Sequence, residues 1–303
     1  MASLYDRPVS EAGRPAPRPR SESRETVELR SIRDRQPELA EAVDMHLELL
    51  ELQRRIQGRV PLPSFDLNTD VITRHAAQGL PLLPFQAIPL ELTDLRLMVR
   101  QTADVLRRHG AIEDSDHRMV QAVGRDMKLL EVVSTWYRSA AERAATATVG
   151  TGAAPATTDV NGAMSEVLAF AMRPFLSRCA EVLQQRADLA LWTHPYCALC
   201  GGAPELAVIT PAAERHLICG RCALRWKFDS LTCPFCLNHE RSRITSFAAR
   251  LGEQDYRVYA CDVCHRFLKA FDARRALRPV MPIVDGVATL PLDAAAIQRG
   301  YTN

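Results

Sequence analysis

Residues 197–264 read CALCGGAPELAVITPAAERHLICGRCALRWKFDSLTCPFCLNHERSRITSFAARLGEQDYRVYACDVC, and they hold eight of the nine cysteines of this 303-residue chain. The eight form four C-x-x-C pairs, separated by 18, 10 and 24 residues. Two intervening residues let a tight turn, here called a knuckle, aim both sulfurs at one ion. The spacing therefore predicts metal binding, with four dithiol redox switches as the alternative. The pairs are Cys197/Cys200, Cys219/Cys222, Cys233/Cys236 and Cys261/Cys264.

Short segments rich in β-branched and aromatic residues lie between and after the pairs and predict strands. Each of the two longer intervals holds two such segments, and the short interval holds one. This order predicts two tandem units, 191–230 and 231–272, that each run knuckle, strand, strand, knuckle, strand and end in Phe-Asp. The first two pairs would then close one site and the last two the other, with a crossed arrangement as the alternative. The predicted strands are 205–210, 215–218, 224–228, 243–247, 256–260 and 266–271.

The ligand set limits the chemistry of these sites. Four thiolates leave no position for water, so such sites are usually structural or transfer electrons. Tetrahedral sulfur suits Zn²⁺ and also a single iron. The knuckle Cys233-Pro-Phe-Cys236 resembles one of rubredoxin type, which also occurs in zinc ribbons. Two metal ions per chain, iron or zinc, are expected.

The part of the chain before the cysteines has a different pattern. Residues 26–190 show no period-two alternation and are predicted to form an all-α domain. Residues 1–25 are rich in Pro, Arg, Ser and Glu and predict a disordered tail. The predicted fold class is α+β and multidomain, with the helical domain followed by two tandem rubredoxin-like or zinc-ribbon domains and a C-terminal tail, 273–303. Helices are expected at 36–58, near 68–78, at 92–109, from about 115 to 137 and at about 161–188 with a bend near Pro174; 146–160 is expected to be a loop, and one last helical turn is expected near 293–299.

Charge and hydropathy exclude several classes of protein. The formal net charge is +2, and two divalent ions on eight thiolates bring it to about −2. A strong field for nucleic acid is therefore not expected. No window of 18 apolar residues is present, and the N-terminal residues lack the apolar core of a secretory signal, so a cytoplasmic protein is expected. No nucleophile elbow, P-loop, HExxH or kinase motif occurs, so no catalytic residue and no enzyme activity are predicted.

Four further groups of residues have a structural interpretation and a functional one. Cys179 lies on an apolar helix stripe and is predicted to be a buried small hydrophobe rather than a reactive thiol. Four histidines near the knuckles are expected at the surface or behind the ligands rather than on the metal: His194, His216, His239 and His265. A carboxylate–histidine cluster is expected to cap a helix, through Asp114 or Ser115, rather than bind metal: Glu113, Asp114, Asp116 and His117. Aromatic residues near the knuckles are expected to pack the ribbon cores rather than stack on bases: Trp192, Tyr196, Trp226 and Phe235.

The cysteine region resembles the formate dehydrogenase accessory protein FdhE family. The resemblance lies in the order C-x-x-C-G, strands, C-x-x-C…W, C-x-x-C and then CDVCHRFLK at 261–269. It extends to RPFL at 173–176 and to LPLD at 290–293 followed by RGY at 299–301. It therefore covers about 36–303, and the second half carries the more specific motifs.

This resemblance implies a role and a partner. Proteins of that family are cytoplasmic and are needed for active respiratory formate dehydrogenases. They act on the molybdenum-containing catalytic subunit before export and are thought to bind it. Carried over to this chain, the resemblance assigns metal ligation to the eight paired cysteines and nothing else. A rubredoxin-like electron carrier and a zinc-ribbon nucleic-acid-binding protein are the alternative functions.

Overall fold

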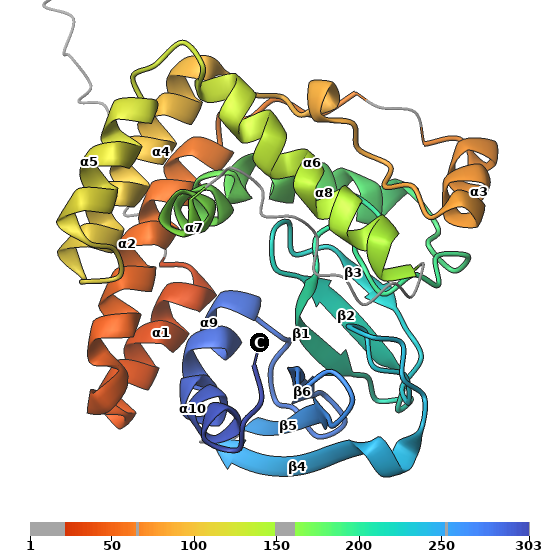
Figure 1. Ribbon diagram of the computed structural model, residues 1–303. Helices are drawn as coiled ribbons and strands as arrows, with labels where there is room; N and C mark the ends of the chain where they lie inside the picture. The colour runs from red at the N-terminus through yellow and green to blue at the C-terminus, as the bar shows by residue number, and fades with distance from the viewer. Residues whose placement is uncertain (1–21, 65–66, 149–160, 252–253, 303) are drawn as a thin grey trace, which may run out of the picture.

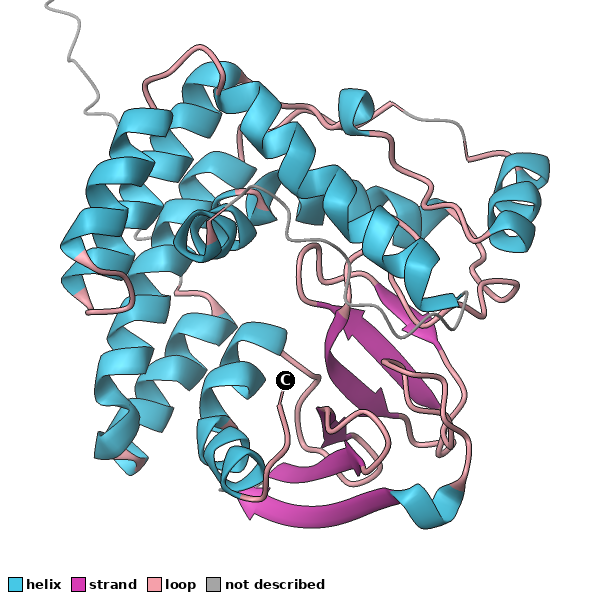
Figure 2. Cartoon of the chain, viewed as in Figure 1, coloured by secondary structure: helices cyan, strands magenta, loops and turns pink. Residues whose placement is uncertain are grey.

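The computed structural model describes residues 22–64, 67–148, 161–251 and 254–302. A helical body comes first, a β-sheet follows, and two short helices end the chain (Figure 1). Within the described residues the body contains helices only, and every strand lies after residue 200 (Figure 2). The mixed α+β class, with the helices first, agrees with the prediction. No described helix is long and apolar enough to cross a membrane.

The helical body follows the predicted pattern, with differences at several ends. Its helices are α1 (Arg24–Arg35), α2 (Ala40–Gln57), α3 (Thr69–Gln78), α4 (Leu92–Arg108), α5 (Asp114–Val123), α6 (Leu129–Thr148), α7 (Gly162–Ala171) and α8 (Arg173–Arg186). Two 3₁₀ turns join them, η1 (Pro37–Leu39) and η2 (Phe85–Ala87). The expected tail overlaps α1, whose N-cap Ser23 accepts a hydrogen bond from Thr26 N. Residues 1–21, and 149–160 of the expected loop at 146–160, lie outside the described part, whereas 146–148 belong to α6.

Two segments that were each predicted as a single helix form two helices in the structure, α5 with α6 and α7 with α8. The helix expected from 115 to 137 is interrupted after Val123, where Gly124 packs so tightly that a Cβ there would lie 3.0 Å from Arg100 Cγ. The helix expected at 161–188 is interrupted at Met172, and Pro174 lies in the first turn of α8, where its missing N–H costs nothing.

The six strands form one sheet, although the sequence suggested two separate ribbons. The strands are β1 (Pro204–Ile209), β2 (Arg215–Cys219), β3 (Arg225–Lys227), β4 (Ile244–Leu251), β5 (Gln254–Cys261) and β6 (Phe267–Asp272), in the order β3-β2-β1-β6-β5-β4. Each unit is an antiparallel meander of three strands, as its order of knuckles and strands predicts. The units join through a parallel pairing of β1 with β6, from Leu206↔Lys269 to Ile209↔Asp272.

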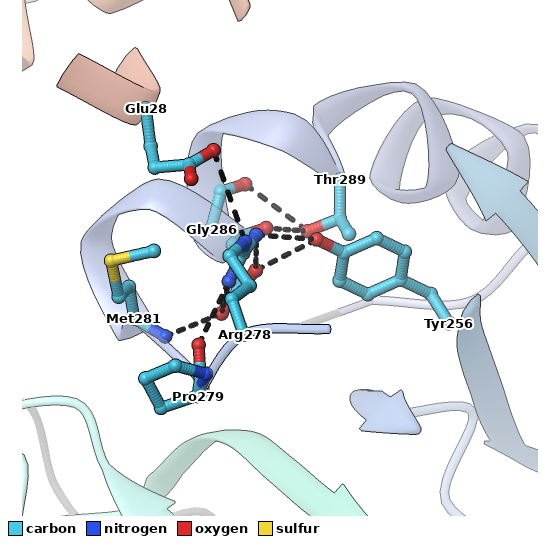
Figure 3. A network of polar contacts seen from close by, with 8 residues as sticks. Glu28, Tyr256, Arg278, Pro279, Met281, Gly286 and Thr289 are labelled. Carbon is cyan, nitrogen blue, oxygen red and sulfur yellow. Dashed lines mark hydrogen bonds and ion pairs between the residues drawn. The ribbon is translucent and has the colours of Figure 1, made fainter. Parts of the chain in front are cut away.

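The C-terminal segment is more ordered than a tail. It forms α9 (Pro282–Ala288) and α10 (Leu290–Gln298), and α9 packs with α1 and α2 around buried apolar side chains. Asp285 of α9 is fully buried and accepts hydrogen bonds from Tyr256 Oη at 2.7 Å, Arg278 Nη2 at 2.6 Å and Met281 N at 2.7 Å. Figure 3 shows Arg278 at the centre of this network, reaching toward Glu28 of α1. The network fastens the last helices to both the sheet and the helical body.

Candidate metal centres

The first four cysteines form a compact group, here called site 1. The Sγ atoms of Cys197, Cys200, Cys219 and Cys222 all lie within 4.8 Å of one another. Two of the sulfur–sulfur distances are 3.5 Å and a third is 3.7 Å. A metal–sulfur bond of about 2.3 Å in a regular tetrahedron places the sulfurs about 3.8 Å apart. The group therefore has the size of a four-coordinate metal centre.

The other four cysteines form a second group, here called site 2. The Sγ atoms of Cys233, Cys236, Cys261 and Cys264 also lie within 4.8 Å of one another. The distance from Cys233 to Cys264 is 3.8 Å and that from Cys236 to Cys261 is 3.6 Å. The cysteines thus group in chain order, and the crossed arrangement is excluded. Each group can hold one metal ion, and both iron and zinc fit four sulfurs at this spacing.

All four knuckles share one backbone turn. In each, the residue after the second cysteine donates its N–H to the carbonyl of the first cysteine, as Gly201 N does to Cys197 O at 3.0 Å. That residue has a positive φ in every case: +70° at Gly201, +60° at Ala223, +60° at Leu237 and +54° at His265. Three of the four are not glycine, although this conformation is costly for them. The strain is retained at these three turns, as expected where a backbone must place two ligands.

Gly220 lies inside the knuckle Cys219–Cys222 but does not supply the unusual backbone conformation of its turn. Its φ is not positive, and the positive φ of that knuckle falls on Ala223. A Cβ on Gly220 would lie 3.1 Å from Glu205 Cβ. The close approach of β1 therefore leaves little room for a larger residue at this position.

Site 1 is built into the core that the sheet shares with the helical body. Its four cysteines are at most 1% exposed and belong to the largest apolar cluster of the described residues. The knuckle carbonyls of Ala198 and Leu199 accept hydrogen bonds from Leu82 N at 2.8 Å and Leu83 N at 2.9 Å. Site 1 therefore joins the sheet to the segment that precedes α4.

Arg221 makes a second connection from site 1 to the body. This residue lies inside the knuckle Cys219–Cys222 and donates to the carbonyls of Trp136 and Tyr137 on α6, both at 3.2 Å. Its guanidinium carbon lies 3.9 Å from the centre of the Trp136 ring, a cation–π contact. Arg221 was not among the predicted functional residues, and its only signal in the sequence is a cation placed between two cysteines.

Site 2 lies at the turn between β5 and β6 and is more exposed to solvent than site 1. Cys233 and Cys261 are buried, whereas Cys236 and Cys264 are partly exposed. Two exposed apolar residues lie at its knuckles. Leu237, directly after Cys236, is 37% exposed, and Val263, directly before Cys264, is 49% exposed. No cysteine of site 2 belongs to an apolar cluster of the described core.

Burial shifts the thiol pKa values in both groups. It raises the pKa of the Cys197 and Cys222 thiols well above the usual range, because the apolar surroundings disfavour a thiolate. It raises the pKa of Cys236 at site 2 to about 11. A bound cation reverses this preference, since it pairs with the thiolates directly. Hydrogen bonds from neighbouring thiols act against burial and lower the pKa of Cys219, and the one from Cys264 lowers the pKa of Cys233 to about 5. Without a metal each group therefore favours a single thiolate, and four thiolates need a bound cation.

The remaining cysteine and histidines have structural positions. Cys179 is fully buried on α8, and burial raises the pKa of its thiol to about 12, so it is unreactive. His194 Nε2 lies 2.8 Å from Ala76 O, and its ring stacks on Tyr196. His265 occupies the positive-φ position after Cys264, and His216 and His239 are in neither group of metal ligands.

The other two predicted groups are also structural. Trp192 and Trp226 are buried, and their indole N–H groups donate to the carbonyls of Tyr196 and His194. Phe235 is half-buried and stacks with Arg266, whose guanidinium carbon lies 3.8 Å from the ring centre. The aromatic residues therefore pack around the knuckles.

The acidic cluster does not cap α5 as predicted. Glu113 occupies the N-cap position without a side-chain hydrogen bond there. Asp114 pairs with Arg107 at 2.7 Å, and His117 Nε2 lies 2.7 Å from Asp104. Among the described residues only the two cysteine groups have metal-ligand geometry, so this cluster is not a metal site.

A comparison with protein-family models finds no match, and a comparison with curated proteins finds none either. Among solved structures the chain is similar to the FdhE protein from Pseudomonas aeruginosa. The identity is 18%, the TM-score is 0.56, and the match covers 92% of this chain and 91% of the other. The chain therefore has an FdhE-like fold over nearly its whole length.

Proposed function

We propose that the protein is an accessory factor that matures a formate dehydrogenase, binding its molybdenum-containing catalytic subunit in the cytoplasm before export. The observation that supports this most is the FdhE-like fold together with two four-cysteine groups in one chain. The resemblance of the cysteine motifs to the FdhE family points to the same role. The proposed factor binds its client and has no catalytic residues of its own.

The geometry suits a binding protein. Each cysteine group uses all four positions of a tetrahedron for protein sulfur, which leaves none for water or substrate. A metal in each site would fix two knuckles and the hairpin between them. A surface that is rigid before binding loses little conformational entropy on association. The metal, iron or zinc, would then supply rigidity to the docking surface.

Capture of the catalytic subunit tests this proposal. The metal-loaded protein, immobilised by a tag at its N-terminus, is expected to retain the precursor of a formate dehydrogenase catalytic subunit from a purified sample. The same protein after metal removal and the variant Arg299→Gln, which changes an arginine outside both sites, are the controls. Equal retention of an unrelated molybdoenzyme, or no retention of the subunit by folded and metal-loaded protein, would contradict the proposal.

Electron transfer is a second candidate, favoured by the partial exposure of Cys236 and Cys264. An iron at site 2 would lie close to the surface, within reach of a redox partner, and iron in such a site accepts one electron reversibly. Protein purified without oxygen would contain iron, and its visible spectrum would bleach with dithionite and recover in air. Two zinc ions per chain and no visible spectrum would exclude this candidate.

A further inference from the structure

A hollow of about 430 Å³ lies where the three parts of the molecule meet. Its walls come from α2, α7 and α8 of the helical body, from β1, β2 and β6 of the sheet, and from α9 and α10, all of which can be found in Figure 1. Its volume falls within the range of small-molecule sites. The cysteines of the two sites do not line it.

The described lining of the hollow has more cations than anions. Three arginines and one lysine face two carboxylates there, and these six residues are Arg173, Arg221, Arg266, Lys269, Glu205 and Asp293. Lys269 is committed to Asp293, with its Nζ 2.6 Å from Oδ2. The excess of positive charge in the hollow therefore comes from the three arginines, which face Glu205 alone.

Two arginines have hydrogen-bonding capacity left over. Arg173 Nη2 donates to Gly220 O at 2.9 Å, and its distance to Glu205 Oε2 is a longer 3.4 Å, with the Glu205 side chain 55% exposed. Arg173 Nε is buried without a hydrogen-bond partner among the described residues, which is costly for a charged group. Arg266 stacks on Phe235 and forms no salt bridge with a described carboxylate. Guanidinium groups in this state bind phosphate and carboxylate groups through paired hydrogen bonds.

The rest of the lining is apolar or neutral. Apolar side chains come from Phe170 on α7, Leu206 and Ile218 on the sheet, and Ile283 on α9. His46 lies 2.8 Å from Ala42 O through Nδ1, and burial together with the charge of Arg173 lowers its pKa, while the hydrogen bond to Ala42 opposes this. The hollow thus combines an apolar wall with guanidinium groups, the usual composition of a site for an amphiphilic anion.

We propose that this hollow binds a small organic oxyanion, a molecule with a phosphate or carboxylate group and an apolar or planar body. The oxyanion contacts Arg173 and Arg266, and the body lies against the apolar wall. None of the eight cysteines lines this site, although Arg221 and Arg266 lie close to them in the chain. Since its walls belong to the helical body, the sheet and the last helices, a ligand there fastens all three together and raises the melting temperature.

Ligand-induced thermal shifts of the metal-loaded, full-length protein test the proposal. The probes are inorganic phosphate, citrate, AMP, and adenosine as the uncharged partner of AMP, with sodium chloride at matched ionic strength as reference. AMP is expected to raise the melting temperature in a saturable way and more than phosphate or citrate, which lack an apolar or planar body, and adenosine is not expected to raise it. Isothermal titration of the best probe then gives the Kd for each variant.

Three variants and one matched control locate the binding. Arg173→Gln and Arg266→Gln are each expected to weaken the best probe at least about 10-fold, because each removes a charge-assisted hydrogen bond. Gly286→Leu fills the hollow, since a Cβ at Gly286 of α9 has no heavy atom within 4 Å, and should abolish binding. Arg299→Gln is the control, because Arg299 also stacks on an aromatic ring, that of Phe247, and does not line the hollow.

Two results would overturn the proposal. One is the absence of any stabilisation by the three anions beyond that of sodium chloride. The other is binding that survives both Arg266→Gln and Gly286→Leu. Metal content is measured for every variant, since Arg266 is two residues from Cys264. Binding of a hexaglutamate peptide without binding of the small anions would replace the small molecule by an acidic segment of a protein partner.

Discussion

Sites 1 and 2 have the same ligands and the same turns, but their surroundings differ. At site 1 every sulfur is buried in the core, and the residue before the last cysteine, Arg221, is bonded to α6. At site 2 the residue at the equivalent place is Val263, which is 49% exposed beside two partly exposed cysteines. Two copies of one metal-binding unit can therefore have separate roles, one joining the parts of the fold and one facing the surface.

The difference determines what metal loss costs. Without a metal, site 1 leaves four thiols inside the apolar core and loosens the knuckles that hold Leu82, Leu83 and α6. Site 2 has no such bonds to the helical body among the described residues, so its knuckles can open locally. Stability should therefore depend mainly on site 1, and metal exchange mainly on site 2.

Paired cysteine variants are expected to give the largest effect. Cys219→Ser should release the metal of site 1 and lower the free energy of unfolding by more than about 4 kcal/mol, because ligand loss and core disruption combine. Cys261→Ser should release the metal of site 2 and cost only about 2 kcal/mol, because fewer contacts depend on it. Metal analysis and urea unfolding followed by circular dichroism measure both. Equal losses of stability in the two variants would remove the distinction between the sites.

Chelation of the wild-type protein is expected to separate the sites in time. Site 2 should lose its ion to a chelator at least about 10-fold faster than site 1, because local opening suffices at site 2 and global unfolding is needed at site 1. Metal release is followed with a chromogenic chelator, and Cys261→Ser, which keeps only site 1, identifies the slow phase. A single phase for both ions in the wild type would show that the two sites open together.

Arg221→Gln tests the connection between site 1 and α6. The variant loses a cation–π contact and hydrogen bonds to two carbonyls, which should lower the free energy of unfolding by about 2 kcal/mol. Both ions should remain bound, because no ligand changes. Arg241→Gln, at an exposed arginine before β4, is the matched control. Loss of the site 1 metal in Arg221→Gln would instead make this arginine part of the metal centre.

The sequence predicted the parts that depend on local patterns. Cysteine spacing gave the grouping of the sulfurs, and all six strands were placed within a few residues, because knuckles and hairpins form between neighbours in the chain. The parallel pairing of β1 with β6 could not be predicted. It joins Leu206 to Lys269, which are far apart in the sequence, and such a pairing has no local sequence pattern. The exposure of site 2 depends on that same long-range packing.

The helical turn predicted near 293–299 belongs to α10, whereas α9 was not predicted. Pro282 and Pro291 each lie in the first turn of a helix, where proline is favoured. Buried Asp285, which orders this segment, looks in the sequence like any surface acid. The close contact of Gly124 with Arg100, at the end of α5, is likewise a property of the packed helices and has no local signal in the sequence.

Cys179→Ser has a smaller expected effect and separates the ninth cysteine from both sites. The hydroxyl is more polar than the thiol in a fully buried position, so stability should fall by about 1 kcal/mol. Metal content should stay the same as in the wild type, because Cys179 belongs to neither group of ligands. Metal analysis of the purified variant checks this, and loss of one ion per chain would show that Cys179 supports site 1.

Val263→Ser should change stability least. Val263 is 49% exposed, so the substitution should alter the free energy of unfolding by less than about 0.5 kcal/mol and leave both ions bound. If site 2 faces a partner, removal of this apolar side chain should weaken capture of the formate dehydrogenase catalytic subunit several-fold, because apolar contact area is lost at the interface. Leu277→Ser is the matched control, because Leu277 is 77% exposed and lies outside both sites. Equal capture by Val263→Ser and Leu277→Ser would place the client on another face and leave site 2 to electron transfer or metal exchange.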